Sequence, residues 1–252
     1  MNGISAVIIT KNDEARLARC LDSLTWVDEI IAVDDLSTDR TVEILEKYKA
    51  KVIRRASEFD FDTQRNTGID AASGPWILQM DSDEVITPEL RGEILASVTV
   101  AGQYAGFEIE RKNFFLGKCL ACDQGQALTK LFLKARGRYY GHHIHEQFRL
   151  DGAVKRLKEP VEHYHFESVS QFVQKLNVYT EQEARVMLAV ERRLNRKDLE
   201  RQMRANAFQV FNNTYFKKKG YSDGMYGLIY AGLKAARHLI LYAKYCELIK
   251  DE

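Results

Sequence analysis

Short apolar segments alternate with amphipathic segments through the first hundred residues of the chain. Four of the apolar segments are brief and rich in β-branched or large apolar residues, as buried parallel strands are. They cover residues 4–10, 29–33, 51–53 and 76–80. Between the first two, Leu17, Leu21 and Leu24 recur at helical spacing, and Asn12 is a candidate N-cap for that helix. The alternation predicts an α/β fold in which helices cover both faces of a mostly parallel sheet.

The pattern changes after the first hundred residues. Segments 106–110 and 131–134 resemble antiparallel strands, with glycine turns between them. The C-terminal third has helical spacing of its apolar residues almost to the end, with one interruption at residues 217–220. We therefore predict a domain over residues 1–167, in which antiparallel strands follow the parallel sheet, and a helical extension over residues 168–252 packed on it.

Charge is distributed unevenly, although the net charge of the 252 residues is only +1. Residues 1–167 hold 22 basic and 27 acidic residues, a net −5, and residues 168–252 hold 15 and 9, a net +6. In the second part, an apolar stripe along residues 225–243 lies beside several basic residues. Such a helix either packs on the domain or rests on an anionic membrane surface, and the sequence leaves both readings open.

The expected location of the protein is the cytoplasm. Four cysteines and no secretory leader fit a reducing compartment. The longest uncharged apolar stretch near the C-terminus, residues 224–233, has about half of the roughly 20 residues needed to span a bilayer. Peripheral contact with the inner face of the cytoplasmic membrane is compatible with these features. No nucleic-acid partner is expected, because the chain is nearly neutral and has no recognised binding module.

Polar residues follow three of the predicted strands directly. They occupy residues 10–14, 34–39 and 81–84. Open parallel sheets bind ligands at the carboxyl ends of their strands, so these segments are the expected binding site. Asp81 and Asp83 form a D-x-D pair there, and such hard oxygen ligands suit Mg²⁺ or Mn²⁺ with substrate phosphates completing the shell.

The chain has no glycine-rich dinucleotide fingerprint after its first strand and no P-loop motif. A dinucleotide dehydrogenase and a P-loop enzyme are therefore disfavoured. A nucleotide site without a glycine-rich loop needs a metal ion and cationic side chains to hold phosphates. Arg65 is the candidate cation, and the alternative for it is a surface ion pair with Asp60 or Asp62.

Taken together, the motifs resemble the large inverting glycosyltransferase family with the GT-A fold, family 2. The resemblance covers roughly residues 4–95 and depends on motifs at residues 6–12, 33–39, 64–66 and 81–83. Two later segments, Gly141–Glu146 and His163–His165, resemble a narrower branch that includes lipopolysaccharide core β-1,4-glucosyltransferases. This branch acts in the synthesis of the cell envelope.

The resemblance implies a role for each matching position. It assigns nucleotide-sugar contacts to six residues, with a carboxylate at Asp35 that recognises a uracil ring. The six are Thr10, Asn12, Asp34, Asp35, Arg65 and Asp81. It also implies that Asp83 is the direct metal ligand and that Asp81 contacts the ribose or supports the metal site. Arg40 departs from the family, which often has a small residue there, and this leaves the shape of that turn open.

An acceptor hydroxyl is a poor nucleophile, so transfer also requires a general base. Glu146 is the preferred candidate, because it follows the D-x-D pair by about sixty residues in the region expected to line the acceptor pocket. Asp123 is the second candidate. Five of the six histidines lie between His142 and His165. One of them, with His145 preferred, completes the metal shell or contacts the diphosphate, or else the histidines bind acceptor hydroxyls or satisfy buried hydrogen bonds.

The expected activity is metal-dependent, inverting transfer of a hexose from a UDP-sugar to a hydroxyl group. By the resemblance, the acceptor is a cell-surface glycan or a lipid-linked molecule such as lipopolysaccharide core. Two alternatives remain from the sequence: a nucleotidyltransferase of similar α/β fold, and a non-catalytic protein that binds nucleotides or carbohydrates.

Overall fold

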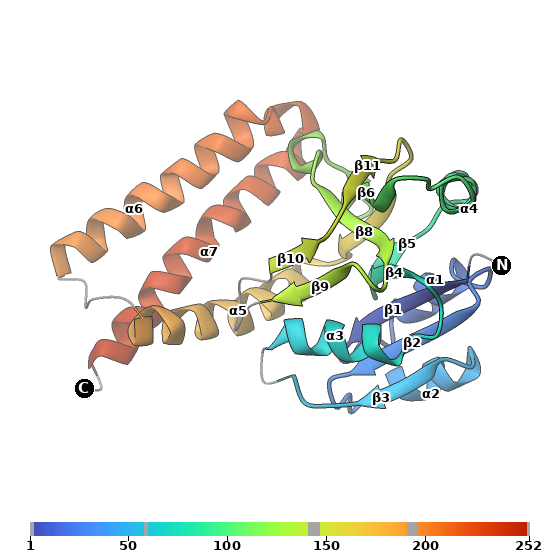
Figure 1. The fold of residues 1–252 in the computed structure, drawn as a ribbon. Coiled ribbons are helices and arrows are strands. Elements are labelled where there is room, and N and C mark those ends of the chain that lie inside the picture. The colour runs from blue at the N-terminus through green and yellow to red at the C-terminus, as the bar shows by residue number, and fades with distance from the viewer. Residues whose placement is uncertain (1–2, 58–59, 141–146, 191–195, 251–252) are drawn as a thin grey trace. The chain divides into compact units, whose positions relative to one another are not determined.

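The computed structural model describes residues 3–57, 60–140, 147–190 and 196–250 (Figure 1). The chain divides into two compact units. The first comprises residues 1–112 and 125–163, and the second comprises residues 113–124 and 164–252. The sequence-based division at residue 167 did not anticipate that a segment from the middle of the chain belongs to the second unit.

Ten strands of the described residues form one mixed sheet in the order β3-β2-β1-β4-β8-β6-β12-β5, and β7 and β11 pair with β6 at its side. Strands β1 to β4 are parallel to one another, and β8 is antiparallel to both β4 and β6. The prediction of parallel strands followed by antiparallel ones is confirmed. The strands are β1 Ile4–Thr10, β2 Glu29–Asp34, β3 Lys51–Arg54, β4 Trp76–Asp81, β5 Glu84–Val85, β6 Tyr104–Phe115, β7 Lys118–Cys119, β8 Ala127–Leu133, β11 Ala153–Arg156 and β12 Val161–Phe166. A separate hairpin pairs β9 Gly137–Tyr140 with β10 Gln147–Leu150.

Helices of the first unit cover both faces of its sheet, as the sequence predicted. They are α1 Leu17–Asp22, α2 Thr41–Lys47, α3 Phe61–Ala71 and α4 Pro88–Thr99. Because side chains alternate along a strand, Ala6 and Ile8 of β1 join a core with α1, α2 and α4, whereas Val7 packs with Ile69 of α3 on the other face. Both β1 and β4 are therefore buried on two sides, which fixes the positions of the loops at their carboxyl ends.

Helix α3 approaches β1 more closely than a side chain at Gly68 would allow. A Cβ atom at this position would lie 2.4 Å from Cγ1 of Val7 and 3.2 Å from Cγ2 of Val33. We expect Gly68→Ala to lower the free energy of unfolding by about 1–3 kcal/mol, because overpacking forces the helix away from the strands. Urea unfolding measures this change. Gly92→Ala, in helix α4 where a Cβ meets no atom within 4 Å, is the matched control and should not destabilise the protein.

The second unit is mainly helical, as predicted for the C-terminal part. Its helices are α5 Val169–Val190, α6 Arg196–Asn212 and α7 Met225–Lys250, with a π-helical turn at Asn213–Lys217 and a 3-10 turn at Gly220–Asp223. Side chains from all three long helices form one core, which includes Ala184, Leu199 and Tyr245. A second core joins Phe115 and Phe172 to Tyr230 of α7. Within the described residues, no helix has the length and apolar character that crossing a membrane requires.

Candidate active site

The loops after β1 and β2 are tied together by hydrogen bonds from backbone to side chain. Asn12 has a left-handed backbone with φ of 50°, its amide donates to Oγ of Ser37 at 2.9 Å, and its Oδ1 accepts from the amide of Thr38 at 2.8 Å. Its expected role as a helix cap is wrong, because α1 begins only at Leu17. Asn12 instead joins the two loops, and Oγ1 of Thr10 donates to the neighbouring Asp13 at 3.0 Å. The two strand ends therefore form one fixed edge.

Asp34 and Asp35 lie in different surroundings despite being adjacent. The Asp34 side chain is fully buried, and its Oδ2 accepts from the amide of Ser37 at 3.1 Å and from Nε of Arg54 at 3.3 Å. The Asp35 side chain is 14% exposed and accepts from Ser57 and from Nζ of Lys11. Burial acts to raise the pKa of the Asp35 carboxyl, but the hydrogen bonds from Lys11 and Ser57 prevail and lower it. Asp35 is therefore an ionised carboxylate at the edge, whereas Asp34 supports the loop.

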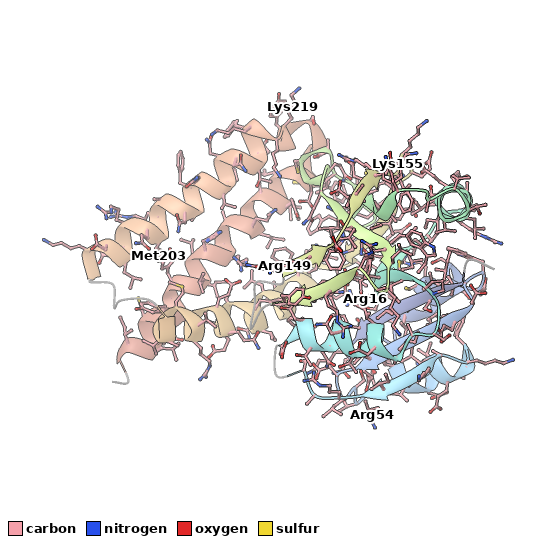
Figure 2. The ribbon with its side chains drawn as sticks, viewed as in Figure 1. Arg16, Arg54, Arg149, Lys155, Met203 and Lys219 are labelled. Atoms are coloured by element: carbon pink, nitrogen blue, oxygen red, sulfur yellow. The ribbon has the colours of Figure 1, made fainter. Side chains whose placement is uncertain are left out.

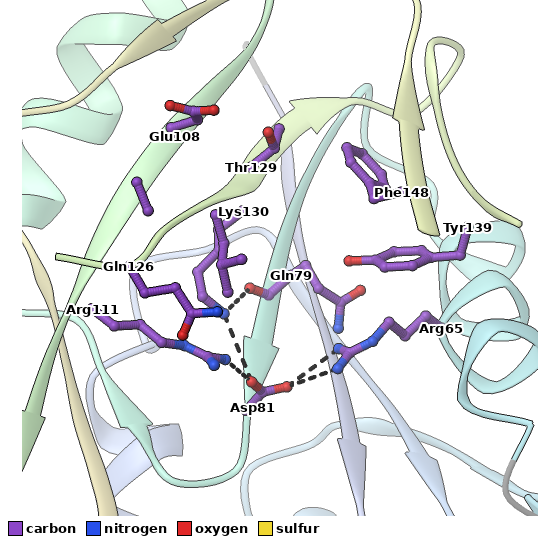
Figure 3. Close-up of a pocket in the computed structure, with 12 residues that line it drawn as sticks. Arg65, Gln79, Asp81, Glu108, Arg111, Gln126, Thr129, Lys130, Tyr139 and Phe148 are labelled. Atoms are coloured by element: carbon purple, nitrogen blue, oxygen red, sulfur yellow. Dashed lines mark hydrogen bonds and ion pairs between the residues drawn. The ribbon is translucent and has the colours of Figure 1, made fainter. Parts of the chain in front are cut away.

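Asp81, at the end of β4, is surrounded by cations. Oδ1 accepts from both Nη atoms of Arg65 at 3.2 Å, Oδ2 accepts from Arg111, and Nζ of Lys130 lies 3.9 Å from Oδ2. Figure 3 shows Arg65 and Arg111 approaching the carboxylate from opposite sides. Burial acts to raise the pKa of Asp81, but the charges of Lys130, Arg65 and Arg111 hold it well below its usual value. This carboxylate stays ionised and has little free capacity for a metal ion.

Glu84 is the second acid in this group and is fully buried. It accepts from Nε of Arg111 at 2.7 Å, from Nζ of Lys130 at 2.6 Å and from the amide of Asp81 at 2.9 Å. Burial acts to lower the pKa of Arg111, but Glu84 and Asp81 raise it above its ordinary value. Three cations and two carboxylates thus form one ionic network behind the D-x-D pair.

Asp83 contacts a different pair of side chains. Nη1 of Arg16 and Nε2 of His163 each lie 3.3 Å from one of its carboxylate oxygens. Arg16 also pairs with Asp13, whose Oδ2 accepts from Oγ of Ser82. Asp83 is thus held beside the loop that follows β1.

A pocket of about 450 Å³ opens beside the ionic network. Its lining includes Arg65, Asp81, Arg111 and Lys130, together with Tyr139 and Phe148 (Figure 3). The two aromatic rings lie 4.9 Å apart, and the guanidinium of Arg65 lies 5.4 Å from the centre of the Tyr139 ring. Charged groups therefore line the pocket together with aromatic surface, as in sites that orient polar ligands.

Of the two candidate bases, Glu146 and Asp123, the structure describes only Asp123. Glu146 and His145 lie outside the described residues, as do the other histidines of that segment. Asp123 lies in the second unit, where Nζ of Lys234 is 3.6 Å from its Oδ1 and Tyr230 contacts it by a hydrogen bond. The Asp123 carboxylate is therefore already engaged by two side chains of the second unit.

The sequence did not point to Arg16, Arg111 or Lys130. It pointed to Arg65 but not to the contact between Arg65 and Asp81. Arg65 contacts Asp81 rather than forming only the surface pair considered as its alternative. One signal for Lys130 was present: it is a lysine inside the apolar strand β8, and a lysine is buried almost only when it is paired. Arg16 and Arg111 had no comparable signal.

Comparison with known proteins identifies the class of this chain. The model of glycosyl transferase family 2 matches residues 5–118. An uncharacterized glycosyltransferase of Rickettsia bellii (strain RML369-C) is 30% identical over 208 residues, which cover 73% of this chain and 67% of that protein. The chain therefore belongs to glycosyl transferase family 2 and is an enzyme that transfers sugars, as the motifs predicted.

Two further comparisons refine this result. The lipopolysaccharide core biosynthesis glycosyltransferase LpsC of Rhizobium meliloti (strain 1021) is 28% identical over 158 residues, 60% of this chain and 58% of that protein. The crystal structure of S. aureus TarS superposes with a TM-score of 0.51 at 19% identity, over 88% of this chain and 46% of that one. The second likeness shows the fold, which is of the predicted GT-A type.

Proposed function

We propose that the protein transfers a hexose from a UDP-sugar, with a divalent metal ion, to a hydroxyl group of a lipid-linked or cell-surface glycan such as lipopolysaccharide core. The similarity to a relative named for lipopolysaccharide core biosynthesis supports the acceptor class. The observation that matters most for the donor is that the loops after β1, β2 and β4 meet at one end of the sheet, which brings the carboxylates of Asp35 and Asp83 to the same side.

The nucleotide is proposed to bind where the first two loops meet. Asp35 would accept a hydrogen bond from the uracil ring, since its carboxylate is ionised and partly exposed. Thr10, Asn12 and Asp34 would hold the loops in place through the contacts described above. Arg65 and Asp81 would contact the diphosphate and ribose from the neighbouring strand end, and the pocket beside them would receive the sugar.

The residues fit a metal ion only together with substrate. Among the described residues, no three His, Cys, Asp or Glu side chains form a metal-binding group. Mg²⁺ and Mn²⁺ often use one or two protein carboxylates with phosphate oxygens, and Asp83 can supply such a carboxylate. A bound metal ion would stabilise the negative charge that develops on the departing diphosphate. His145, proposed as a further ligand, lies outside the described residues.

On the acceptor side, Glu146 is proposed to remove the hydroxyl proton, since the other candidate, Asp123, already contacts Lys234. Reaction on the face opposite the leaving group inverts the configuration at the anomeric carbon. A lipid-linked acceptor would require the enzyme to work at the inner face of the cytoplasmic membrane. A nucleotidyltransferase and a non-catalytic binding protein are set aside, because the chain belongs to a glycosyltransferase family.

Calorimetric titration with UDP tests the donor site. We expect binding with Mn²⁺ that weakens strongly in EDTA, and at least tenfold weaker binding for Asp35→Ala, because a buried donor on uracil then lacks its charged acceptor. Asp22→Ala, at an exposed aspartate that contacts Tyr48, is the matched control and should bind as the wild type does. Tighter binding of GDP or CDP than of UDP would contradict the UDP-sugar assignment.

A further inference from the structure

Large apolar side chains are exposed where α6 gives way to α7. Phe208 is 72% exposed, Phe216 55%, Tyr221 53% and Met225 70%. Three consecutive exposed lysines, Lys217–Lys219, lie in the same turn, and Figure 2 shows Lys219 at the junction of the two helices. We call these seven residues the junction surface. Exposed apolar groups gathered beside charge mark interaction sites more often than singly scattered ones do.

The junction surface is built on a closely packed turn. The ring of Tyr215 lies 5.1 Å from that of Phe216 and 6.4 Å from that of Tyr221. Helix α7 starts directly against this turn, because a Cβ at Gly227 would lie 1.9 Å from the carbonyl oxygen of Gly220. The backbone that carries the exposed rings is therefore already fixed. A partner that binds the rings would not have to order this backbone on binding.

The charge around the junction is almost entirely positive. Residues 201–246 contain eight basic residues and one acidic residue, Asp223. The Asp223 side chain is buried and accepts from the amides of Ala121 and Cys122, so it is turned away from solvent. Lys234, Arg237 and Lys244 each pair with an acid. By contrast, Lys217–Lys219 form no ion pair with any residue that the structure describes.

We propose that the junction surface binds the anionic phospholipid face of a membrane. Lysines that lack ion-pair partners are attracted to an anionic leaflet, and exposed aromatic side chains enter the boundary between headgroups and acyl chains. The junction surfaces of two copies of this chain would both be positively charged and would repel each other. The charge therefore favours a bilayer over a second copy of this chain. Membrane binding would bring the enzyme to a lipid-linked acceptor, and only this purpose rests on the proposed function.

The structure also changes which part of α7 meets the membrane. The sequence suggested an apolar stripe along the helix, but Ile229 and Leu233 pack against the core of the second unit, beside the buried Tyr230. The most exposed apolar side chain of α7 is Met225, at 70%, which lies at the N-terminal end beside the lysines, whereas Leu239 and Ile240 farther along are 43% and 36% exposed. We therefore place the proposed contact at the tip of the helical hairpin, where the most exposed apolar side chains lie beside the lysines.

Vesicle sedimentation with the full chain tests the proposal. We expect binding to phosphatidylcholine vesicles that contain about a third phosphatidylglycerol and little binding to pure phosphatidylcholine. The triple variant Lys217→Gln, Lys218→Gln, Lys219→Gln should bind about a hundredfold more weakly, and Phe208→Ser with Phe216→Ser at least tenfold. Lys47→Gln, Lys49→Gln, Lys51→Gln removes the same charge from the first unit and should bind as the wild type does. Unchanged thermal unfolding would show that each variant is folded.

Three results would overturn the proposal. They are no binding of the wild type to anionic vesicles, equal weakening in the two lysine triples, and a dimer in light scattering that the phenylalanine variant abolishes while vesicle binding persists. UDP titration of the same preparations separates this proposal from the proposed function. Intact UDP binding without vesicle binding rejects only the junction surface, and vesicle binding without UDP binding rejects only the assigned donor.

Discussion

Asp83→Asn is expected to lower the rate of sugar transfer about a thousandfold, because it removes the charged oxygen proposed to bind the metal ion. This substitution can separate an effect on turnover from an effect on stability. The Asp83 carboxylate lies 3.3 Å from Arg16 and 3.3 Å from His163, and an asparagine keeps its size and one of its oxygens. The loss should therefore affect turnover far more than stability. The measurement is UDP release with a range of Mn²⁺ concentrations, beside thermal unfolding of the same preparation.

The matched control is Asp70→Asn. Asp70 is exposed and pairs with Arg138 at the surface, where an ion pair contributes little. We expect its turnover to equal that of the wild type. If Asp83→Asn kept full turnover and the same response to Mn²⁺, Asp83 would not be the metal ligand. If it unfolded at a much lower temperature, the residue would be structural, and Asp83→Glu would be needed to test whether a carboxylate restores turnover.

The meeting of the three polar segments could be predicted, because it follows from the course of the parallel strands. The polar segments after β1, β2 and β4 meet at one edge, since these strands are parallel neighbours with Thr10 opposite Asp34 and Ile9 opposite Asp81. No long-range contact beyond the strand order was needed for this inference. The motifs therefore identified the family and the edge of the sheet together.

The network behind the D-x-D pair could not be predicted. Arg111 and Lys130 reach it from β6 and β8, and their positions depend on the antiparallel register of β4, β8 and β6. A shift of one residue in such a register turns every side chain to the other face, and the sequence does not specify which register forms. For this reason the sequence could not distinguish Asp81, which is held by Arg65, Arg111 and Lys130, from Asp83, which contacts Arg16 and His163.

Glu84→Gln is expected to lower the free energy of unfolding by about 3–5 kcal/mol, the largest stability effect that we predict for a single substitution in this protein. Glu84 is fully buried and contacts Arg111 and Lys130, so its neutral replacement removes the carboxylate that pairs with both of these buried cations. Burying unpaired charge costs far more than losing an exposed ion pair does. Urea unfolding at neutral pH measures the change, and Glu46→Gln, at an exposed carboxylate of α2, should alter stability by no more than about 0.5 kcal/mol.

The double variant Glu84→Gln, Lys130→Met separates charge imbalance from loss of packing. Removing Lys130 together with Glu84 takes away one charge of each sign and returns the network to the balance of the wild type. We expect the double variant to be more stable than Glu84→Gln alone, with a coupling free energy of about 1–3 kcal/mol between the two positions. Additive losses would mean that Glu84 acts mainly through shape and its hydrogen bond to the amide of Asp81. In that case the cations around the D-x-D pair would be stabilised by Asp81 and by solvent in the pocket rather than by the buried acid.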